Sequence, residues 1–205
     1  SKGHGTISIK NIKFNIEVTS FRIDEATYGR AAKVKFTNDI FIDSCRRDFT
    51  INAIYSDFNG NLYDPHEGLN DLNNKIIKFI GDPTKRIIED HLRIIRYFRF
   101  IAQYSNAINL LEKNSLEACI KNKDLIKNIS RERINLEFTK LILSENASIS
   151  ILLLRKYKII DMILKGSSRI KKSDIIAFDG IYKDYLVRLS YICLLYTSPS
   201  PRDAT

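Results

Sequence analysis

The chain has 205 residues, of which 44% are hydrophobic and 28% are charged, and its formal net charge is +9. This balance is typical of a soluble globular protein of one or two domains, and no apolar run approaches the length of a transmembrane helix. The positive charge indicates a polyanionic partner, most commonly nucleic acid, and three cysteines without metal-ligand spacing predict a reducing, cytoplasmic setting without disulfides.

Two short strands open the predicted fold, at residues 6–10 and 13–21, and a tight turn joins them. In the second strand Ile16 and Val18 alternate with polar residues, so Glu17 falls on the polar face of that strand. Taken by itself, Glu17 is an ordinary surface glutamate.

Residues 22–43 are polar and irregular, and we expect a flexible loop there with a short strand near residues 34–36. The next stretch, residues 46–54, alternates charged and apolar side chains at helical spacing and predicts a short helix. Its polar side chains are suited to hold a ribose and phosphates, and a basic helix start is the plainer alternative. These polar residues are Arg46, Arg47, Asp48 and Asn52.

A hairpin and a hinge are expected within residues 58–82. Asn59-Gly60 is a common pair for a type I′ turn, and residues 75–80 predict a short strand that ends at Gly81. The hinge therefore lies directly before the helix that organises the rest of the chain.

One long helix is predicted at residues 83–104, with Asp82 as its N-cap and Pro83 at its first position. At about 100° per residue its apolar side chains share one broad face, which indicates packing against a core. They are Ile87, Ile88, Leu92, Ile94, Ile95, Phe98 and Ile101. The other side carries a narrow charged stripe of Arg86, Glu89, Asp90, Arg93 and Arg96.

The charged stripe has more cations than its acids can balance. Arg93 can pair with Glu89 and with Asp90 at helical spacing. Arg93, Arg96 and Arg99 repel one another, and Arg99 fits less well because it lies toward the apolar flank. We interpret the missing anion as a ligand, since guanidinium groups bind phosphate bidentately, and a solvated charged face is the alternative.

The same stripe is suited to read a nucleobase. Cytosine and adenine each present an amino donor beside a ring-nitrogen acceptor, so Asp90 can accept from the amino group while Arg93 donates to the ring nitrogen. Uracil and guanine present the reverse pattern and leave such a pair unsatisfied.

Helices are predicted to follow as far as the last residues of the chain. Apolar periodicity places them at residues 107–122, at 131–142 behind the N-cap Ser130, at 149–164, and at one or two places within 174–195. The stretch from Cys193 onward resembles the translation of a sequencing adapter, so residues 193–205 are expected to be a non-native tail.

Several separate stretches match one known pattern in order and spacing, from residue 1 to about residue 143. The most specific are the arginine motif Arg46–Ala53 and the helix motif Glu89–Arg93. The others are His4–Thr6, Glu17–Arg22, Asp71–Leu72, Phe79–Pro83, and Ser130–Ile134 with Glu137 and Phe138. Together they resemble the bacterial class II tRNA nucleotidyltransferases, or CCA-adding enzymes, and the related bacterial poly(A) polymerases.

The resemblance implies an α+β fold, in which the remnant of a nucleotidyltransferase palm with a mixed or antiparallel sheet precedes an all-helical neck and body. The implied segments are 1–57 for the C-terminal part of the head, 58–82 for the hairpin and hinge, 83–145 for the neck with its nucleotide-template helix, 146–192 for the start of the body, and 193–205 for the tail.

The resemblance also implies a role for each candidate residue. Glu17 matches the third carboxylate of the metal site and is the implied catalytic residue. Residues 22–42 match a flexible loop linked with switching from C to A addition. The nucleotide-binding matches are Arg46, Arg47, Asp48 and Asn52 for the ribose and triphosphate, Asp90 and Arg93 with Glu89 in support for the base, and Arg96 and Arg99 for the triphosphate.

The implied function is maturation of the tRNA 3′ end by template-independent addition of C, C and A from CTP and ATP, with two Mg²⁺ ions and no membrane partner. The family's glycine-rich opening motif and its Asp-x-Asp metal pair have no match here, so we expect an internal fragment that is inactive alone. A poly(A) polymerase and a CC- or A-adding specialist are close alternatives. A non-catalytic helical RNA-binding module is the alternative of another class.

Overall fold

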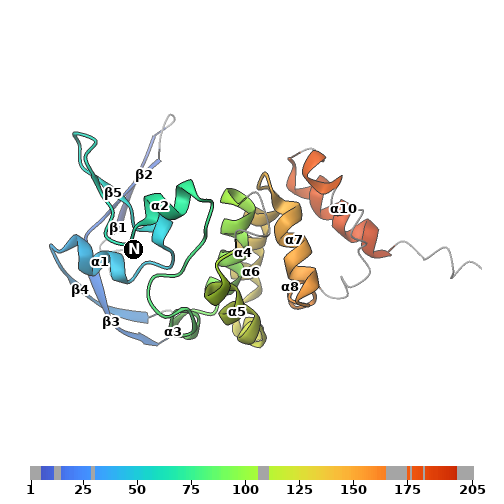
Figure 1. The fold of residues 1–205 in the computed structure, drawn as a ribbon, viewed down its shortest axis with the longest axis horizontal. Coiled ribbons are helices and arrows are strands. Elements are labelled where there is room, and N and C mark those ends of the chain that lie inside the picture. Colours follow the sequence, from blue (N-terminus) through green and yellow to red (C-terminus); the bar gives the residue numbers. More distant parts are fainter. Residues whose placement is uncertain are drawn as a thin grey trace, which may run out of the picture.

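The computed structural model describes residues 6–11, 15–28, 31–105, 111–164, 175, 177–181 and 183–197. Its strands precede most of its helices, which confirms the predicted α+β fold. In Figure 1 the strands lie on the left, α4 (Arg93–Tyr104), α6 (Arg131–Ile142) and α7 (Ala147–Lys156) stand in the middle, and α10 (Tyr185–Thr197) lies on the right. None of the described helices is long and apolar enough to cross a bilayer.

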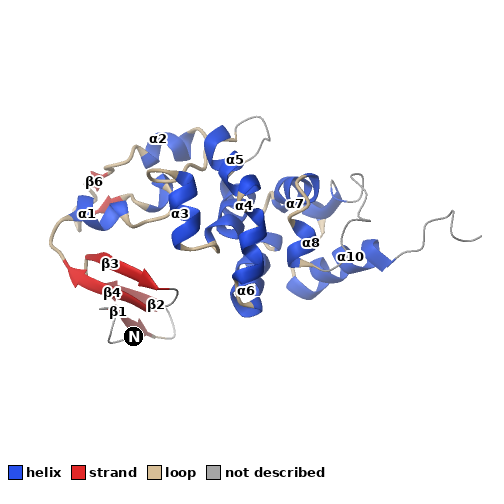
Figure 2. Ribbon diagram, turned by 90° about the horizontal axis from the view of Figure 1, so that it is seen from below, coloured by secondary structure: helices blue, strands red, loops and turns tan. Residues whose placement is uncertain are grey.

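Two antiparallel hairpins form the first part of the chain, at the end of the molecule away from α10 (Figure 2). Strands β1 (Thr6–Lys10) and β2 (Asn15–Thr19) pair within the predicted ranges. Strands β3 (Arg22–Tyr28) and β4 (Ala31–Phe36) pair next. The short strand expected near residues 34–36 is therefore confirmed, whereas residues 22–28 and 31–33, expected to be irregular, form strands as well. Backbone groups alone make the hydrogen bonds of a ladder, so a polar segment without regular alternation can still form one.

Helix α1 (Ile40–Cys45) begins behind Asp39, whose carboxylate caps its first turn. It ends before the arginine motif, so the predicted helix over residues 46–54 is wrong. The motif begins in a turn at residues 46–48 and contains only a short 3₁₀ helix, Thr50–Asn52. Phe49, which the pattern placed on the apolar side, is fully buried.

The hairpin around Gly60 joins β5 (Tyr55–Ser56) to β6 (Leu62–Tyr63) in the predicted place. Its turn is not type I′, which needs left-handed backbone at both central residues. The carbonyl oxygen of Asp57 accepts the N–H of Gly60 at 3.1 Å, and the left-handed backbone falls on Gly60 itself (φ 85°), after the central pair.

Residues 75–80 do not form the predicted strand, because their described pairing is a single bridge between Phe79 and Phe49. Their apolar side chains enter an aromatic cluster instead. The ring of Phe49 lies 4.7 Å from that of Phe79 and 5.1 Å from that of Phe100, and Tyr97 stacks on Phe79 at 5.9 Å. Since Phe49 directly follows Asp48, this cluster anchors the arginine motif to α4.

The predicted helix over residues 83–104 is in fact two helices, α3 (Pro83–Glu89) and α4 (Arg93–Tyr104). Helix α3 ends at Asp90, whose backbone is extended (φ −148°, ψ 105°). The carboxylate of Asp90 accepts the N–H of Leu92 at 3.2 Å. A short polar side chain that bonds the nearby backbone competes with helical hydrogen bonds, and this explains the break.

The predicted apolar face is buried apart from Ile88, which is 59% exposed. The exception follows from the break, because α3 packs against α5 (Lys113–Lys121) and has an apolar side of its own. The buried members are Ile87, Leu92, Ile94, Ile95, Phe98 and Ile101.

Helices α6 and α7 pack against α4, whereas α8 (Ile160–Ile163) packs against α7 and α10 against α6. The predicted helix over residues 149–164 is divided into α7 and α8, because Lys158 has left-handed backbone (φ 58°). Helix α10 is tied to the end of α6 by Arg188, a fully buried side chain that donates to the carbonyl oxygens of Ile142 and Ser144 at 2.6 and 2.9 Å. The other described helices are the 3₁₀ helices Lys123–Asn128 and Ala177–Gly180.

Replacing Gly68 by alanine should destabilise the chain. Gly68 opens α2 (Gly68–Asn73), and a Cβ atom there would lie 2.3 Å from the backbone oxygen of Thr50, at the turn that follows Asp48. We expect G68A to lower the free energy of unfolding by about 1–3 kcal/mol, measured by urea denaturation. The control is G180A, since a Cβ at Gly180 meets no atom within 4 Å. Equal midpoints for both variants would contradict the close approach.

Candidate functional site

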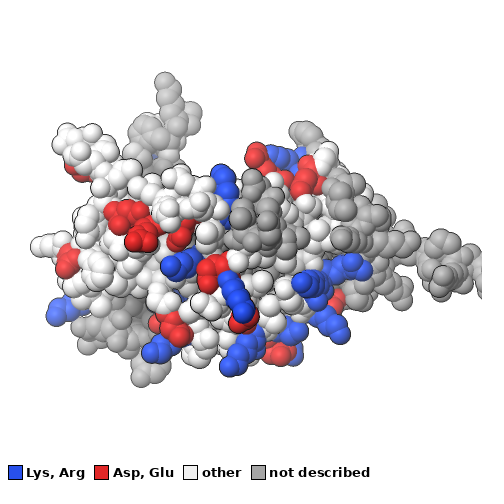
Figure 3. All heavy atoms as spheres, in the orientation of Figure 1, with Lys and Arg blue, Asp and Glu red and all other residues white. Residues whose placement is uncertain are grey.

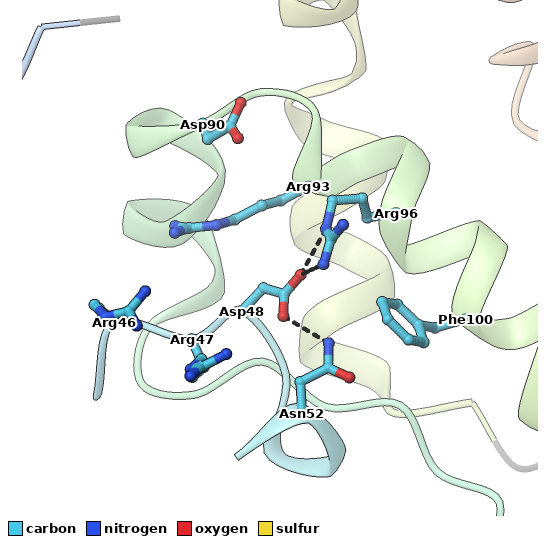
Figure 4. Close-up of a pocket in the computed structure, with 8 residues that line it drawn as sticks. All are labelled: Arg46, Arg47, Asp48, Asn52, Asp90, Arg93, Arg96 and Phe100. Atoms are coloured by element: carbon cyan, nitrogen blue, oxygen red, sulfur yellow. Dashed lines mark hydrogen bonds and ion pairs between the residues drawn. The ribbon is translucent and has the colours of Figure 1, made fainter. Parts of the chain in front are cut away.

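A cavity of about 420 Å³ lies where the turn after α1 faces the junction of α3 and α4 (Figure 4). Figure 4 shows Arg93 reaching from the start of α4 toward the side on which Arg46 and Arg47 lie. Four arginines and two aspartates give the cavity its positive character. The lining residues are Arg46, Arg47, Asp48, Asn52, Asp90, Arg93, Arg96 and Phe100.

Asp43, on α1, orients the first two arginines of the cavity. Its carboxylate is fully buried, accepts from Arg46 at 2.6 and 2.9 Å, and accepts from Arg47 at 3.1 and 3.3 Å. Tyr55 donates its hydroxyl to the same carboxylate at 2.9 Å, and burial together with that bond raises the pKa of Tyr55 to about 12. One acid that does not line the cavity therefore orients both guanidinium groups.

Arg86, on α3, fastens the helices to this turn. Its guanidinium donates to the backbone oxygens of Arg46, at 2.5 Å, and Arg47. It also pairs with Glu89 at 2.5 Å, and Glu89 pairs in turn with Arg93 at 2.7 Å, at the predicted i, i+4 spacing. Glu89 thus supports Arg93 from outside the set of lining residues.

Asp48 is the central acid of the cavity. One of its oxygens accepts from Nε of Arg96 at 2.7 Å and lies 2.6 Å from Nη2 of the same arginine, and the other accepts the side-chain amide of Asn52 at 2.8 Å and the N–H of Phe49 at 3.0 Å. Burial by itself raises the pKa of Asp48, but Arg96 and Asn52 outweigh it and hold the pKa below the ordinary value. Asp48 is therefore ionised at neutral pH.

The arginines of α4 have protein acids beside them, so the expectation that no acid balances them is wrong. Glu137, a buried residue of α6, lies 2.8 Å from Arg99 and 3.5 Å from Arg96. Arg99 is itself buried, stacks 4.0 Å from the ring centre of Phe100, and does not line the cavity. The compensating acids were missed because Asp48 and Glu137 lie far from α4 in the sequence.

Asp90 and Arg93 both line the cavity, but they do not form the expected ion pair with each other. Asp90 pairs with Arg133 of α6, whose Nη2 lies 2.9 and 3.1 Å from the two carboxylate oxygens. Arg93 donates to Glu89 and to the backbone oxygen of Arg86, both at 2.7 Å. The two side chains are thus oriented separately, by different parts of the helical region.

Glu17 does not join this cluster. It lies on the exposed strand β2, opposite Ser8, and is absent from the cavity lining. Within the part of the chain that the structure describes, no group of three or more histidine, cysteine, aspartate or glutamate side chains could hold a metal ion. Among the described residues, Glu17 therefore has no partners with which it could hold a metal ion.

Sequence reasoning overlooked several side chains that shape the cavity. Asp43 had a recognisable signal, because it precedes Arg46 and Arg47 by three and four residues. Arg133 and Glu137 lie in a stretch that matched the family pattern, but nothing in their local spacing points to Asp90 or Arg96. Phe100 lines the cavity from α4, and its local spacing does not single it out either.

Two family models match the chain. The poly A polymerase head domain matches residues 1–78, and the probable RNA and SrmB-binding site of polymerase A matches residues 111–170. The mitochondrial CCA tRNA nucleotidyltransferase 1 of Danio rerio is 42% identical over 144 residues, which are 70% of this chain and 33% of that protein. The CCA-adding enzyme of Streptococcus gordonii is 43% identical over 144 residues, 69% of this chain and 35% of that one.

Solved structures agree with these matches. The Bacillus stearothermophilus CCA-adding enzyme in complex with CTP has a TM-score of 0.73 and 29% identity, and the match covers 89% of this chain and 43% of that chain. A tRNA nucleotidyltransferase complexed with a primer tRNA and an incoming ATP analog has a TM-score of 0.69 and 25% identity, over 95% of this chain and 58% of that one. The chain belongs to the family of tRNA nucleotidyltransferases and poly(A) polymerases, and it spans about a third of the length of the curated relatives it matches.

Replacing Asp43 by asparagine should destabilise the chain most at neutral pH. Burial alone would raise the pKa of Asp43, but hydrogen bonds from Arg46, from the Arg22 amide and from Tyr55 outweigh it and lower the pKa. A carboxylate whose pKa is lowered by folding stabilises the fold above its unfolded pKa, and that contribution is lost as the pH falls through the folded value.

We expect D43N to lower the free energy of unfolding by about 2–3 kcal/mol at pH 7, measured by urea denaturation. The difference from the wild type should shrink as the pH falls below 3.8. Glu117→Gln, at a side chain that is 62% exposed, is the control and should leave stability nearly unchanged. A deficit of D43N that stays constant across this pH range would contradict the role of the ionised carboxylate.

Proposed function

We propose that this chain is the nucleotide-selecting region of an enzyme that matures tRNA 3′ ends by adding C, C and A from CTP and ATP without a nucleic-acid template. The observation that carries the proposal is one cavity in which arginines for a triphosphate and an aspartate–arginine combination for a base lie together. The relatives named CCA-adding enzymes and the complexes with CTP and an ATP analog support it.

The triphosphate is proposed to bind Arg46, Arg47 and Arg96, with Arg99 acting from behind the cavity. Arg46 and Arg47 each use Nε and Nη2 on Asp43, and each guanidinium group has further N–H groups that can donate to an anion. Guanidinium groups held from behind lose little freedom when they bind an anion, which favours phosphate recognition.

The ribose is proposed to bind Asn52 in the first instance. A carboxylate offers about four acceptor positions, and Asp48 already accepts from Arg96, Asn52 and the Phe49 amide. Because the side-chain amide of Asn52 donates to Asp48, its carbonyl oxygen is available to accept a ribose hydroxyl. Asp48 accordingly orients Asn52 and Arg96.

The base is proposed to be read by Asp90 and Arg93, with Glu89 holding Arg93. Nη1 of Arg93 is used on Glu89 and Arg86, and its other N–H groups remain for a ring nitrogen. Cytosine and adenine satisfy an acceptor beside a donor, whereas uracil and guanine leave both protein groups unpaired at a cost of about 1–3 kcal/mol.

Catalysis in the whole protein is proposed to use two Mg²⁺ ions, with Glu17 as one ligand. Such ions activate the attacking 3′-hydroxyl and neutralise the leaving pyrophosphate. The described carboxylates do not fit such a site, because Glu17 has no acidic cluster around it.

The tRNA is proposed to lie along the helical part of the chain in a cytoplasmic enzyme. On the face shown in Figure 3, Lys and Arg side chains gather over the helices at the lower right, while Asp and Glu cluster over α2. The formal net charge of +9 favours a polyanion, and phosphate contacts of this kind weaken as salt is raised. A poly(A) polymerase, a CC- or A-adding specialist and a non-catalytic RNA-binding module remain the competing functions.

Replacing Asp90 by alanine should abolish the preference for CTP and ATP. Isothermal titration calorimetry of the 205-residue chain with CTP, ATP, UTP and GTP measures it directly. We expect the ratio of CTP to UTP affinity to fall about tenfold or more, because a hydrogen bond to a charged group is lost. Inorganic tripolyphosphate should bind D90A as it binds the wild type.

Asp124→Asn is the matched control, because Asp124 is an exposed aspartate of the helical part that pairs only with Lys127 among the described contacts. A D90A variant that keeps the wild-type order of nucleotide affinities would refute base reading by this residue.

The 205-residue chain by itself should not extend tRNA. The measurement is incubation with tRNA lacking CCA, Mg²⁺ and each labelled NTP, beside a longer protein that carries this region together with an acidic metal pair. We expect incorporation of C and then A by the longer protein alone. Long A tails would favour the polymerase, RNA binding without incorporation would favour the binding module, and incorporation by the short chain would contradict the metal argument.

A further inference from the structure

We propose, resting on the function proposed above, that Arg133 of α6 is a positioning residue that fixes the Asp90 carboxylate at the cavity and so sets the choice of base. Arg133 lies outside the set of residues that line the cavity. Asp90 is contacted by Leu92 within the link between α3 and α4 and by Arg133 from α6.

The backbone at Asp90 does not hold its side chain in place. Asp90 lies in the extended link between α3 and α4, outside both helices, and its side chain is 35% exposed. Its local contact is the N–H of Leu92, which one carboxylate oxygen accepts at 3.2 Å. A carboxylate with one long local bond can rotate about its side-chain torsions.

Arg133 supplies the long-range contact that prevents this rotation. Its Nη2 lies 3.1 Å from Oδ1 and 2.9 Å from Oδ2 of Asp90, so a single nitrogen spans both oxygens. One turn further along α6, Glu137 pairs with Arg96 and Arg99 of α4. Arg133 therefore acts from a helix that is already fixed against the cavity.

Among the described residues, the Asp90 carboxylate accepts three hydrogen bonds, so it can accept one more. Of the roughly four acceptor positions of a carboxylate, Asp90 uses two on Oδ1, for Leu92 and Arg133, and one on Oδ2, for Arg133. One position on Oδ2 remains for the amino group of cytosine or adenine. If Arg133 were removed, Asp90 could turn to Arg93, which also lines the cavity, and the two groups would satisfy each other instead of the base.

The test is calorimetric titration of the 205-residue chain with CTP, UTP and inorganic tripolyphosphate. We expect R133A to lower the ratio of CTP to UTP affinity about tenfold, with tripolyphosphate affinity kept within about twofold. R133K should retain part of the preference, because one nitrogen makes both contacts to Asp90. Lys140→Ala removes the same charge from α6 at a side chain that is 56% exposed, and should keep the wild-type ratio.

Other outcomes separate the two proposals. If the wild type binds no triphosphate, or binds CTP and UTP equally, the proposed function fails and the role of Arg133 fails with it. If the wild type prefers CTP and R133A keeps that preference, the role of Arg133 alone is overturned. A loss of tripolyphosphate binding that parallels the loss of CTP preference would also overturn it, since the arginine would then support the whole cavity. If R133A melts far below the wild type, the ratios of CTP to UTP affinity measured for R133K and R133Q test the role of Arg133 instead.

Discussion

The ion pair between Asp48 and Arg96 is the contact on which the rest of the site depends. It joins residues that are 48 positions apart and holds the turn after α1 against α4. Asp48 is only 8% exposed, and breaking a buried, hydrogen-bonded pair costs about 3–5 kcal/mol. Because Glu137 of α6 contacts the same arginine, one guanidinium group sets the relative positions of three segments that surround the cavity.

Three of the four arginines that line the cavity, Arg46, Arg47 and Arg93, are paired with an acid that lies outside the lining. Asp43 serves Arg46 and Arg47 in this way, and Glu89 serves Arg93. The acids keep the cluster stable when no anion is bound, because like charges would otherwise repel one another. They also orient the donors, so a bound triphosphate meets groups that need little further ordering.

Much of this could be predicted from the sequence, wherever the signal was local. Periodicity identified the buried face of α4, and i, i+4 spacing identified the pair of Glu89 and Arg93. The break at Asp90 was missed because hydrophobic period alone does not register a polar side chain that competes for the backbone. The pairing of Asp90 with Arg133 was out of reach, because those residues meet across 43 positions only after α6 packs on α4.

The central claim is that protein side chains in this cavity take the place of a nucleic-acid template. A crystal structure of the 205-residue chain with bound CTP tests it most directly. The account predicts the cytosine amino group within hydrogen-bond distance of Asp90 Oδ2, with the phosphates against Arg46 and Arg47. CTP bound elsewhere, or bound in the cavity with its base turned away from Asp90 and Arg93, would contradict the account.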